Sequence, residues 1–105
     1  MKTIDVKTAK RWLDSGEAIM IDIREKSEHA MMHIEGVQLL PKSCFNVNQL
    51  PELSDKKLII MCHMGPRGVM VCGKIEEDTG VEAYNLEGGI MGWYKNNLPV
   101  IECED

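Results

Sequence analysis

The stretch KKLIIMCHMGPRGVMVCGKIEEDTGVEAYNL, residues 56–86, has the pattern of a strand, a helix and a second strand in succession. The apolar run 58–61 is short, uninterrupted and bounded by lysines on one side, which is typical of a strand buried on both faces. Pro66 suits the first turn of the helix that follows, and Gly80 lies just beyond its predicted end. Residues 81–86 predict the second strand. A helix that joins two such strands indicates a parallel sheet covered by helices.

The rest of the chain continues this alternation. Residues 5–16 predict a helix with Asp5 as its N-cap and Gly16 just past its end. A strand is expected next, at 18–21, and then a short helix or turn capped by Ser27. The remaining expected elements are a short strand near 37–41, a weak helix at 45–53 and a helix after the glycines at 88–89. The predicted fold class is α/β, with a central, mostly parallel sheet flanked by short helices on both faces, in one domain over residues 1–105.

Composition excludes several classes of function. The chain has 105 residues and a net charge of −5, and its lysines and arginines form no cluster, which argues against nucleic-acid binding. Its apolar runs are far shorter than the roughly 18 residues of a membrane span. Residues 1–12 lack the apolar stretch of a signal peptide. We therefore expect a cytoplasmic protein in a reducing compartment, without a membrane partner.

The four cysteines, Cys44, Cys62, Cys72 and Cys103, form no CxxC pair, which disfavours both zinc binding and a disulfide framework. Cys72 is expected to be a small buried hydrophobe and Cys103 an exposed residue without a role. Cys44 lies in a polar loop and could be a second reactive thiol. Cys62 differs from these because it stands at the carboxyl end of a predicted parallel strand, where ligands gather in such sheets.

The loop after Cys62 suits a reactive thiol. The thiolate is the nucleophilic form of cysteine, and free cysteine has a pKa of about 8.5. Backbone N–H groups at the start of a helix, together with its dipole, favour an anion there. Gly65 permits a curled backbone, and Arg67 brings a permanent cation that can bind an oxyanion with two hydrogen bonds. Pro66 has no N–H and removes one donor from the loop. A buried cysteine at an ordinary strand-to-helix turn remains the alternative.

Three blocks of sequence resemble the rhodanese-like family of single-domain sulfurtransferases. CHMGPRG at 62–68 is similar to the family's active loop, Cys-x-x-Gly-x-Arg-Ser/Thr. IDIRE at 21–25, followed by Glu28 and by HIEG at 33–36, resembles the block that precedes this loop. LEGGIMGW at 86–93 resembles the block that follows it. The three blocks stand in the family's order and cover nearly the whole chain.

The resemblance implies a rhodanese-like α/β fold and a persulfide intermediate on Cys62. It implies that Arg67 assists catalysis and that Asp22 and Arg24 support the loop from the neighbouring strand end. It also implies a cradle for the outer sulfur, built from the backbones of His63, Met64, Gly65, Arg67 and Gly68. The chain departs from the family pattern where Gly68 replaces Ser/Thr and where Met32 replaces glycine.

The expected activity is transfer of a sulfane sulfur from a small anionic, thiosulfate-like donor to cyanide or a thiol, without a cofactor or metal. The alternative is a carrier module that accepts persulfide from one protein partner and relays it to another. Phosphatase chemistry is disfavoured because only four residues separate Cys62 from Arg67. A Cu(I) site is disfavoured because the neighbouring residues Met61–Met64 alternate faces on a strand. An inert interaction domain is the remaining possibility.

Overall fold

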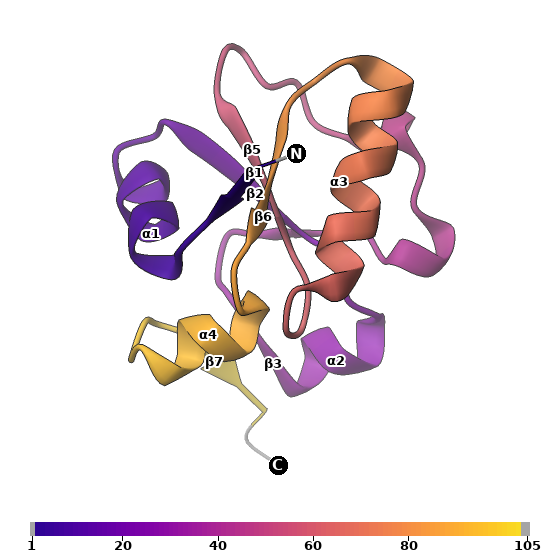
Figure 1. Ribbon diagram of the computed structural model, residues 1–105. Helices are drawn as coiled ribbons and strands as arrows, with labels where there is room; N and C mark the ends of the chain where they lie inside the picture. Colours follow the sequence, from indigo (N-terminus) through magenta and orange to yellow (C-terminus); the bar gives the residue numbers. More distant parts are fainter. Residues whose placement is uncertain (1, 104–105) are drawn as a thin grey trace.

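The structure is a computed structural model that describes residues 2–103, and a five-stranded parallel sheet forms its centre (Figure 1). The strand order is β1-β6-β5-β2-β4, and every neighbouring pair in it is parallel. The strands are β1 (Lys2–Ile4), β2 (Ala18–Asp22), β4 (Gln38–Leu39), β5 (Lys57–Met61) and β6 (Ala83–Leu86). The parallel sheet predicted from the alternating pattern is therefore confirmed.

Within residues 2–103, four α-helices accompany the sheet: α1 (Val6–Asp14), α2 (Lys26–Met31), α3 (Pro66–Thr79) and α4 (Gly89–Lys95). Two short 3-10 turns, at Lys42–Cys44 and Val47–Gln49, lie between β4 and β5. A separate antiparallel pair joins β3 (Met32–His33) to β7 (Ile101–Glu102). Among residues 2–103, no helix is long and apolar enough to cross a membrane.

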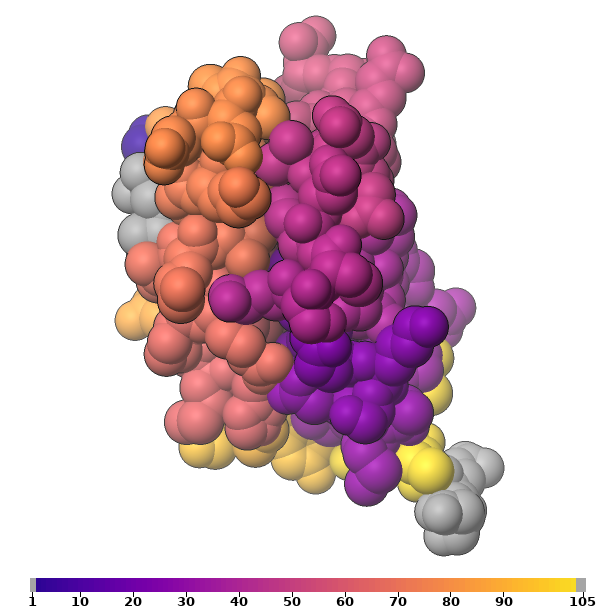
Figure 2. Space-filling model, turned by 90° about the vertical axis from the view of Figure 1, so that its right-hand side faces the viewer, coloured from indigo at the N-terminus to yellow at the C-terminus, as the bar shows by residue number. Residues whose placement is uncertain are grey.

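Apolar side chains pack on both faces of the sheet and cover it in two layers. Helices α1 and α4 cover one face, where Ala9, Met20 and Trp93 belong to one buried cluster. Helix α3 covers the other face, where Ile60 and Cys72 belong to a second cluster. The segment that contains the 3-10 turns lies beside α3 on this second face (Figure 2). Helices therefore flank both faces of the sheet, as the sequence predicted.

The signals in the sequence mark the ends of α1 and α3, whereas the helix expected at 45–53 is only a 3-10 turn at Val47–Gln49. The Asp5 side chain accepts a hydrogen bond from the Thr8 N–H at 2.8 Å and caps α1, as predicted. Gly80 ends α3 in the left-handed conformation. The prediction that Ser27 caps the next helix is wrong, because Glu25 is the N-cap of α2. Glu28 completes a capping box there by accepting a hydrogen bond from the Glu25 N–H at 2.9 Å.

The parallel arrangement brings the carboxyl ends of β2 and β5 to one edge of the sheet. Asp22 pairs with Met61 in the register of these strands, so Cys62 follows directly at this edge. Helix α2 and the start of α4 gather at the same end of the molecule (Figure 1). The predicted nucleophile therefore lies among the loops that follow the strands, where an α/β protein ordinarily places its site.

Candidate active site

Cys62 is a recessed thiol that follows the last residue of β5. The residue is only 1% exposed and belongs to the buried cluster beneath α3. The Gly65 N–H donates a hydrogen bond to the Cys62 Sγ at 3.0 Å. At least one loop amide therefore points inward at the sulfur, as the loop chemistry requires, although the thiol is more deeply covered than an open cradle would leave it.

The loop turns sharply at Gly65, which has a φ of 128° and forms the N-cap of α3. Glycine adopts this angle without the steric cost that a side chain would add. Pro66 follows at the first position of the helix, where its missing N–H costs no intrahelical hydrogen bond. His63 and Met64 are exposed on the outside of the loop. Their side chains are therefore available to whatever approaches the thiol.

Arg67 binds a carboxylate, and both of its terminal nitrogens are occupied. Its Nη1 and Nη2 donate to the two carboxylate oxygens of Glu28 at 2.7 Å each, and both side chains are about a third exposed. These hydrogen bonds lower the pKa of Glu28 to about 2, and the same contact raises the pKa of Arg67. Arg67 thus ties the loop to α2, whereas the sequence suggested a guanidinium that binds an oxyanion.

Asp22 and Arg24 form a buried ion pair next to the contact between Arg67 and Glu28. The Arg24 Nη2 lies 2.8 Å from the Asp22 carboxylate, and both side chains are at most 3% exposed. Arg24 also donates to the backbone carbonyls of Glu28 at 3.2 Å and Met32 at 2.7 Å. The pair thus holds α2, and α2 in turn holds Arg67. Asp22 and Arg24 thus act on the loop indirectly, because Arg24 contacts Glu28 and Glu28 binds Arg67.

The start of α4 holds the loop from a second side. The backbone N–H groups of Ile90 and Met91 donate to the carbonyls of Cys62 at 2.9 Å and His63 at 3.1 Å. Gly89 precedes them with a φ of 58°, and a Cβ at this position would collide with both carbonyl oxygens. The glycine pair at 88–89 therefore allows the close approach of α4 to the loop.

Residues 5–96 match the sequence family described as Rhodanese-like domain. The chain belongs to the rhodanese-like family. The probable adenylyltransferase/sulfurtransferase MoeZ of Mycobacterium tuberculosis is 33% identical over 92% of this chain, which spans 26% of that protein's length. The thiosulfate sulfurtransferase GlpE of Vibrio cholerae is 24% identical, with 92% of each chain covered. A rhodanese-related protein of Thermoplasma volcanium has a TM-score of 0.82 at 22% identity, covering 99% of this chain and 100% of that one.

The other thiols of this rhodanese-like chain lie in different environments. Cys72 is fully buried in α3, and burial raises its pKa to about 12, so it stays protonated at neutral pH. This agrees with the small buried hydrophobe expected from the sequence. Cys44 and Cys103 are both exposed. Cys44 therefore has the access that a second reactive thiol needs, but its reactivity stays a prediction.

His29 of α2 and His33 of β3 stack on each other. The rings of His29 and His33 are 4.1 Å apart, and the His33 Nδ1 lies 3.2 Å from the His29 carbonyl. Burial, followed by the neighbouring His33, lowers the pKa of His29. Within residues 2–103, no group of three or more His, Cys, Asp or Glu side chains could hold a metal ion.

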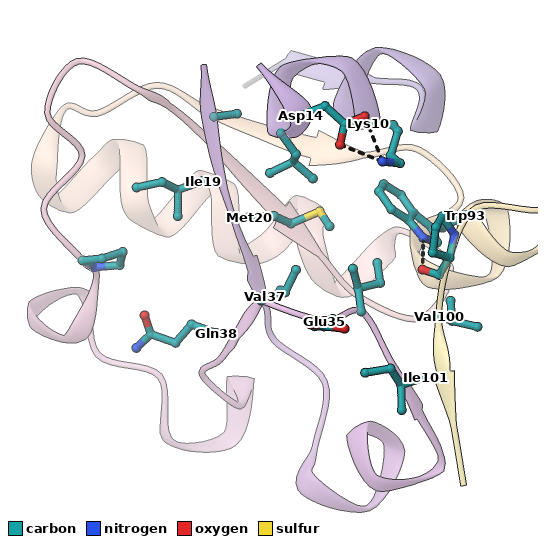
Figure 3. Close-up of a pocket in the computed structure, with 16 residues that line it drawn as sticks. Lys10, Asp14, Ile19, Met20, Glu35, Val37, Gln38, Trp93, Val100 and Ile101 are labelled. Carbon is teal, nitrogen blue, oxygen red and sulfur yellow. Dashed lines mark hydrogen bonds and ion pairs between the residues drawn. The ribbon is translucent and has the colours of Figure 1, made fainter. Parts of the chain in front are cut away.

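This rhodanese-like domain also has a hollow of about 580 Å³ (Figure 3). Met20, Val37, Trp93 and Val100 are among the residues that line it, and Lys10 and Asp14 form an ion pair at its rim. Met20 and Trp93 belong to the cluster beneath α1 and α4, whereas Cys62 belongs to the cluster on the opposite face. The hollow is therefore separate from the loop.

Four residues next to the loop were not predicted as its partners from the sequence. Glu28 was recognised only as part of a family block, and the N–H groups of Ile90 and Met91 leave no trace in residue type. Asn85, a buried polar residue of β6, was read only as part of a strand. The glycine pair after β6 was the available signal, since two adjacent glycines at a strand end indicate a close backbone approach.

The pairing of Glu28 with Arg67 predicts a pH-dependent contribution to stability. The pKa of Glu28 is lowered from 4.5 to about 2, so the stabilisation is fully present above pH 4.5 and is lost as the pH falls towards 2. Urea unfolding of wild type and Glu28→Gln should therefore show the largest difference in free energy above pH 5. The difference should shrink steadily towards pH 2. A difference that does not change with pH would show that the ion pair contributes nothing.

Proposed function

We propose that the protein is a sulfurtransferase that carries a sulfane sulfur as a persulfide on Cys62. The hydrogen bond from the Gly65 N–H to the Cys62 Sγ, at the carboxyl end of a parallel strand, carries this proposal. Membership of the rhodanese-like family supports it, and sulfurtransferases are among the relatives. The relative named as a thiosulfate sulfurtransferase supports a thiosulfate-like donor.

The chemistry takes place in two displacements at sulfur. The Cys62 thiolate attacks the outer sulfur of thiosulfate, the sulfur–sulfur bond of the donor breaks, and sulfite leaves with the electron pair. Cyanide or a thiolate then attacks the outer sulfur of the persulfide. The new bond to the acceptor forms as the persulfide bond breaks, and the Cys62 thiolate is regenerated. Atoms and electrons balance without a cofactor.

The loop backbone stabilises the anions of both steps. The Gly65 N–H already donates to the sulfur, and the N–H groups of His63, Met64, Arg67 and Gly68 are the other donors we propose for the outer sulfur and the sulfite. The N-terminus of α3 adds a positive potential at the same place. Arg67 contributes by fixing the loop to Glu28, and Asp22 with Arg24 contributes by holding α2.

Access limits the donor to a small molecule or requires the loop to open. Cys62 is 1% exposed, so a bulky donor cannot reach its sulfur unless the loop moves. The loop carries its own hydrogen bonds at both ends, from Gly65 to the sulfur and from α4 to the carbonyls. We therefore expect loading to be slower than alkylation of an exposed cysteine such as Cys44.

A carrier module is the second candidate, and the exposed apolar residues beside the loop favour it. Met64 in the loop is 59% exposed, and Val69 and Met70 near the start of α3 are 42% and 64% exposed. Flexible methionine side chains suit the surfaces on which proteins dock. A protein donor or acceptor docked there would lie next to the Cys62 loop. Comparing cyanide turnover with loading from a cysteine persulfide donor separates this module from an enzyme.

The decisive test is mass spectrometry after incubation with thiosulfate. Wild type is expected to gain the mass of one sulfur atom, on the peptide that contains Cys62, and Cys62→Ala is expected to gain none. Cys44→Ala is the matched control and should load as wild type does. An adduct that persists in Cys62→Ala, or that is found on Cys44, would overturn the assignment.

A further inference from the structure

Asn85 is a polar side chain buried beneath the Cys62 loop. It is 4% exposed and lies in β6, where it pairs with Ile60 of the neighbouring strand β5. Ala83 in β6, Ile60 in β5 and Cys62, which follows β5, all belong to the cluster under α3. The carboxamide thus occupies a place in the core where an apolar side chain would be ordinary.

The carboxamide lies against the two glycines of the loop. A Cβ built on Gly68 would collide with the Asn85 Oδ1 and would lie 3.2 Å from its Cγ. A Cβ on Gly65 would lie 3.9 Å from the Asn85 Nδ2. Asn85 therefore fills the space into which a side chain at position 68 would point, and it lies beneath the residue whose N–H holds the sulfur.

The Oδ1 of Asn85 has no hydrogen-bond partner among residues 2–103, although it is buried. A buried carbonyl without a partner costs free energy, because its hydrogen bond to water is lost and not replaced. A leucine of similar size would fill the same space without this cost. Stability alone therefore does not account for an asparagine at this position.

We infer that Asn85 is a positioning residue of the Cys62 loop. Its carboxamide sets how closely the backbone of Gly65 and Gly68 approaches the sheet, and hence how the Gly65 N–H meets the sulfur. Gly68 lacks a side chain because the carboxamide fills that space. The effect on sulfur transfer rests on the proposed function, whereas the effect on the thiol does not.

Alkylation of Cys62 by iodoacetamide, followed across pH by mass spectrometry of its peptide, tests this inference. Asn85→Ala should slow alkylation at pH 7 about 2- to 10-fold and move the profile to higher pH, because the N–H hydrogen bond to the sulfur weakens. Its free energy of unfolding, measured with urea, should fall little, because the change removes an unpaired carbonyl. An unchanged alkylation profile in a folded Asn85→Ala protein would overturn the inference.

A double-mutant cycle with Gly68 supplies the second test. Gly68→Ala should also slow alkylation, because its methyl group displaces the carboxamide. The double variant Gly68→Ala with Asn85→Ala should react more nearly like wild type than either single variant, because one methyl group then refills part of the space. Purely additive effects would overturn the inference. If Asn85→Ala does not fold, Asn85→Ser takes its place, with a smaller shift expected in the same direction.

The two proposals fail in different ways. Wild type that gains no sulfur from thiosulfate or from a cysteine persulfide would contradict the proposed function, while the alkylation cycle would still decide the role of Asn85. Wild type that loads normally, together with additive alkylation effects, would retain the function and reject the positioning role.

Discussion

Asp22→Ala is expected to lower the free energy of unfolding by about 3–5 kcal/mol, because it leaves the Arg24 charge buried without its partner. Asp22 is 1% exposed and Arg24 2%, so water cannot replace the lost carboxylate. The Asp22 carboxylate also accepts a hydrogen bond from the Arg24 backbone N–H at 3.0 Å, which fixes the turn after β2. Urea unfolding at neutral pH measures the loss directly.

Asp14→Ala is the matched control, because Asp14 forms an ion pair with Lys10 on the surface of α1. That pair has a distance of 2.7 Å, and the Asp14 side chain is 61% exposed. Exposed pairs contribute about 0–1 kcal/mol, so the control should change stability far less. Equal losses in the two variants would show that the Arg24 charge finds other compensation and would remove the basis for its role in holding α2.

Gly89→Ala is expected to displace the Cys62 loop and to lower stability by about 2 kcal/mol or more. Its methyl group would meet the Cys62 carbonyl oxygen and would lie 2.5 Å from the His63 oxygen, and alanine resists a φ of 58°. These backbone atoms cannot turn aside as a flexible side chain can. The variant should therefore also lose sulfur loading from thiosulfate, which mass spectrometry measures.

Gly73→Ala is expected to change stability in the opposite direction from Gly89→Ala. Gly73 lies inside α3, and nothing stands within 4 Å of the place that its Cβ would take. Alanine in a helix interior should raise stability by about 0.5–1 kcal/mol and leave loading unchanged. If both glycine variants behaved alike, the close contact of α4 with the loop would not be the cause.

The central elements could be predicted from sequence because their signals are local. The apolar run that forms β5 is bounded by lysine and turn residues, and Pro66 and Gly80 mark the two ends of α3. Strand β1 was missed because its three residues at the sheet edge include a lysine and a threonine, and only Ile4 is partly buried. Ser27 resembled a cap, but the side chains of Glu25 and Glu28 form the capping box instead.

In the candidate site, too, the features that depend on local sequence could be predicted, whereas contacts between distant residues could not. Cys62 and Gly65 could be predicted, because a thiol and a glycine at a strand end have chemical meaning without knowledge of the fold. The partner of Arg67 could not, since Glu28 stands 39 positions earlier and several other acids were available. The same holds for Asn85, whose neighbour Gly68 belongs to another element.

The segment 99–102 touches both supports of the thiol loop. Pro99 accepts a hydrogen bond from the Trp93 Nε1 of α4 at 2.8 Å, and β7 pairs with β3, directly after α2. A force applied to this segment would therefore reach the Cys62 loop through both α4 and α2. A tag or fusion partner that follows this segment should be attached through a flexible linker, since tension there would alter the reactivity of Cys62.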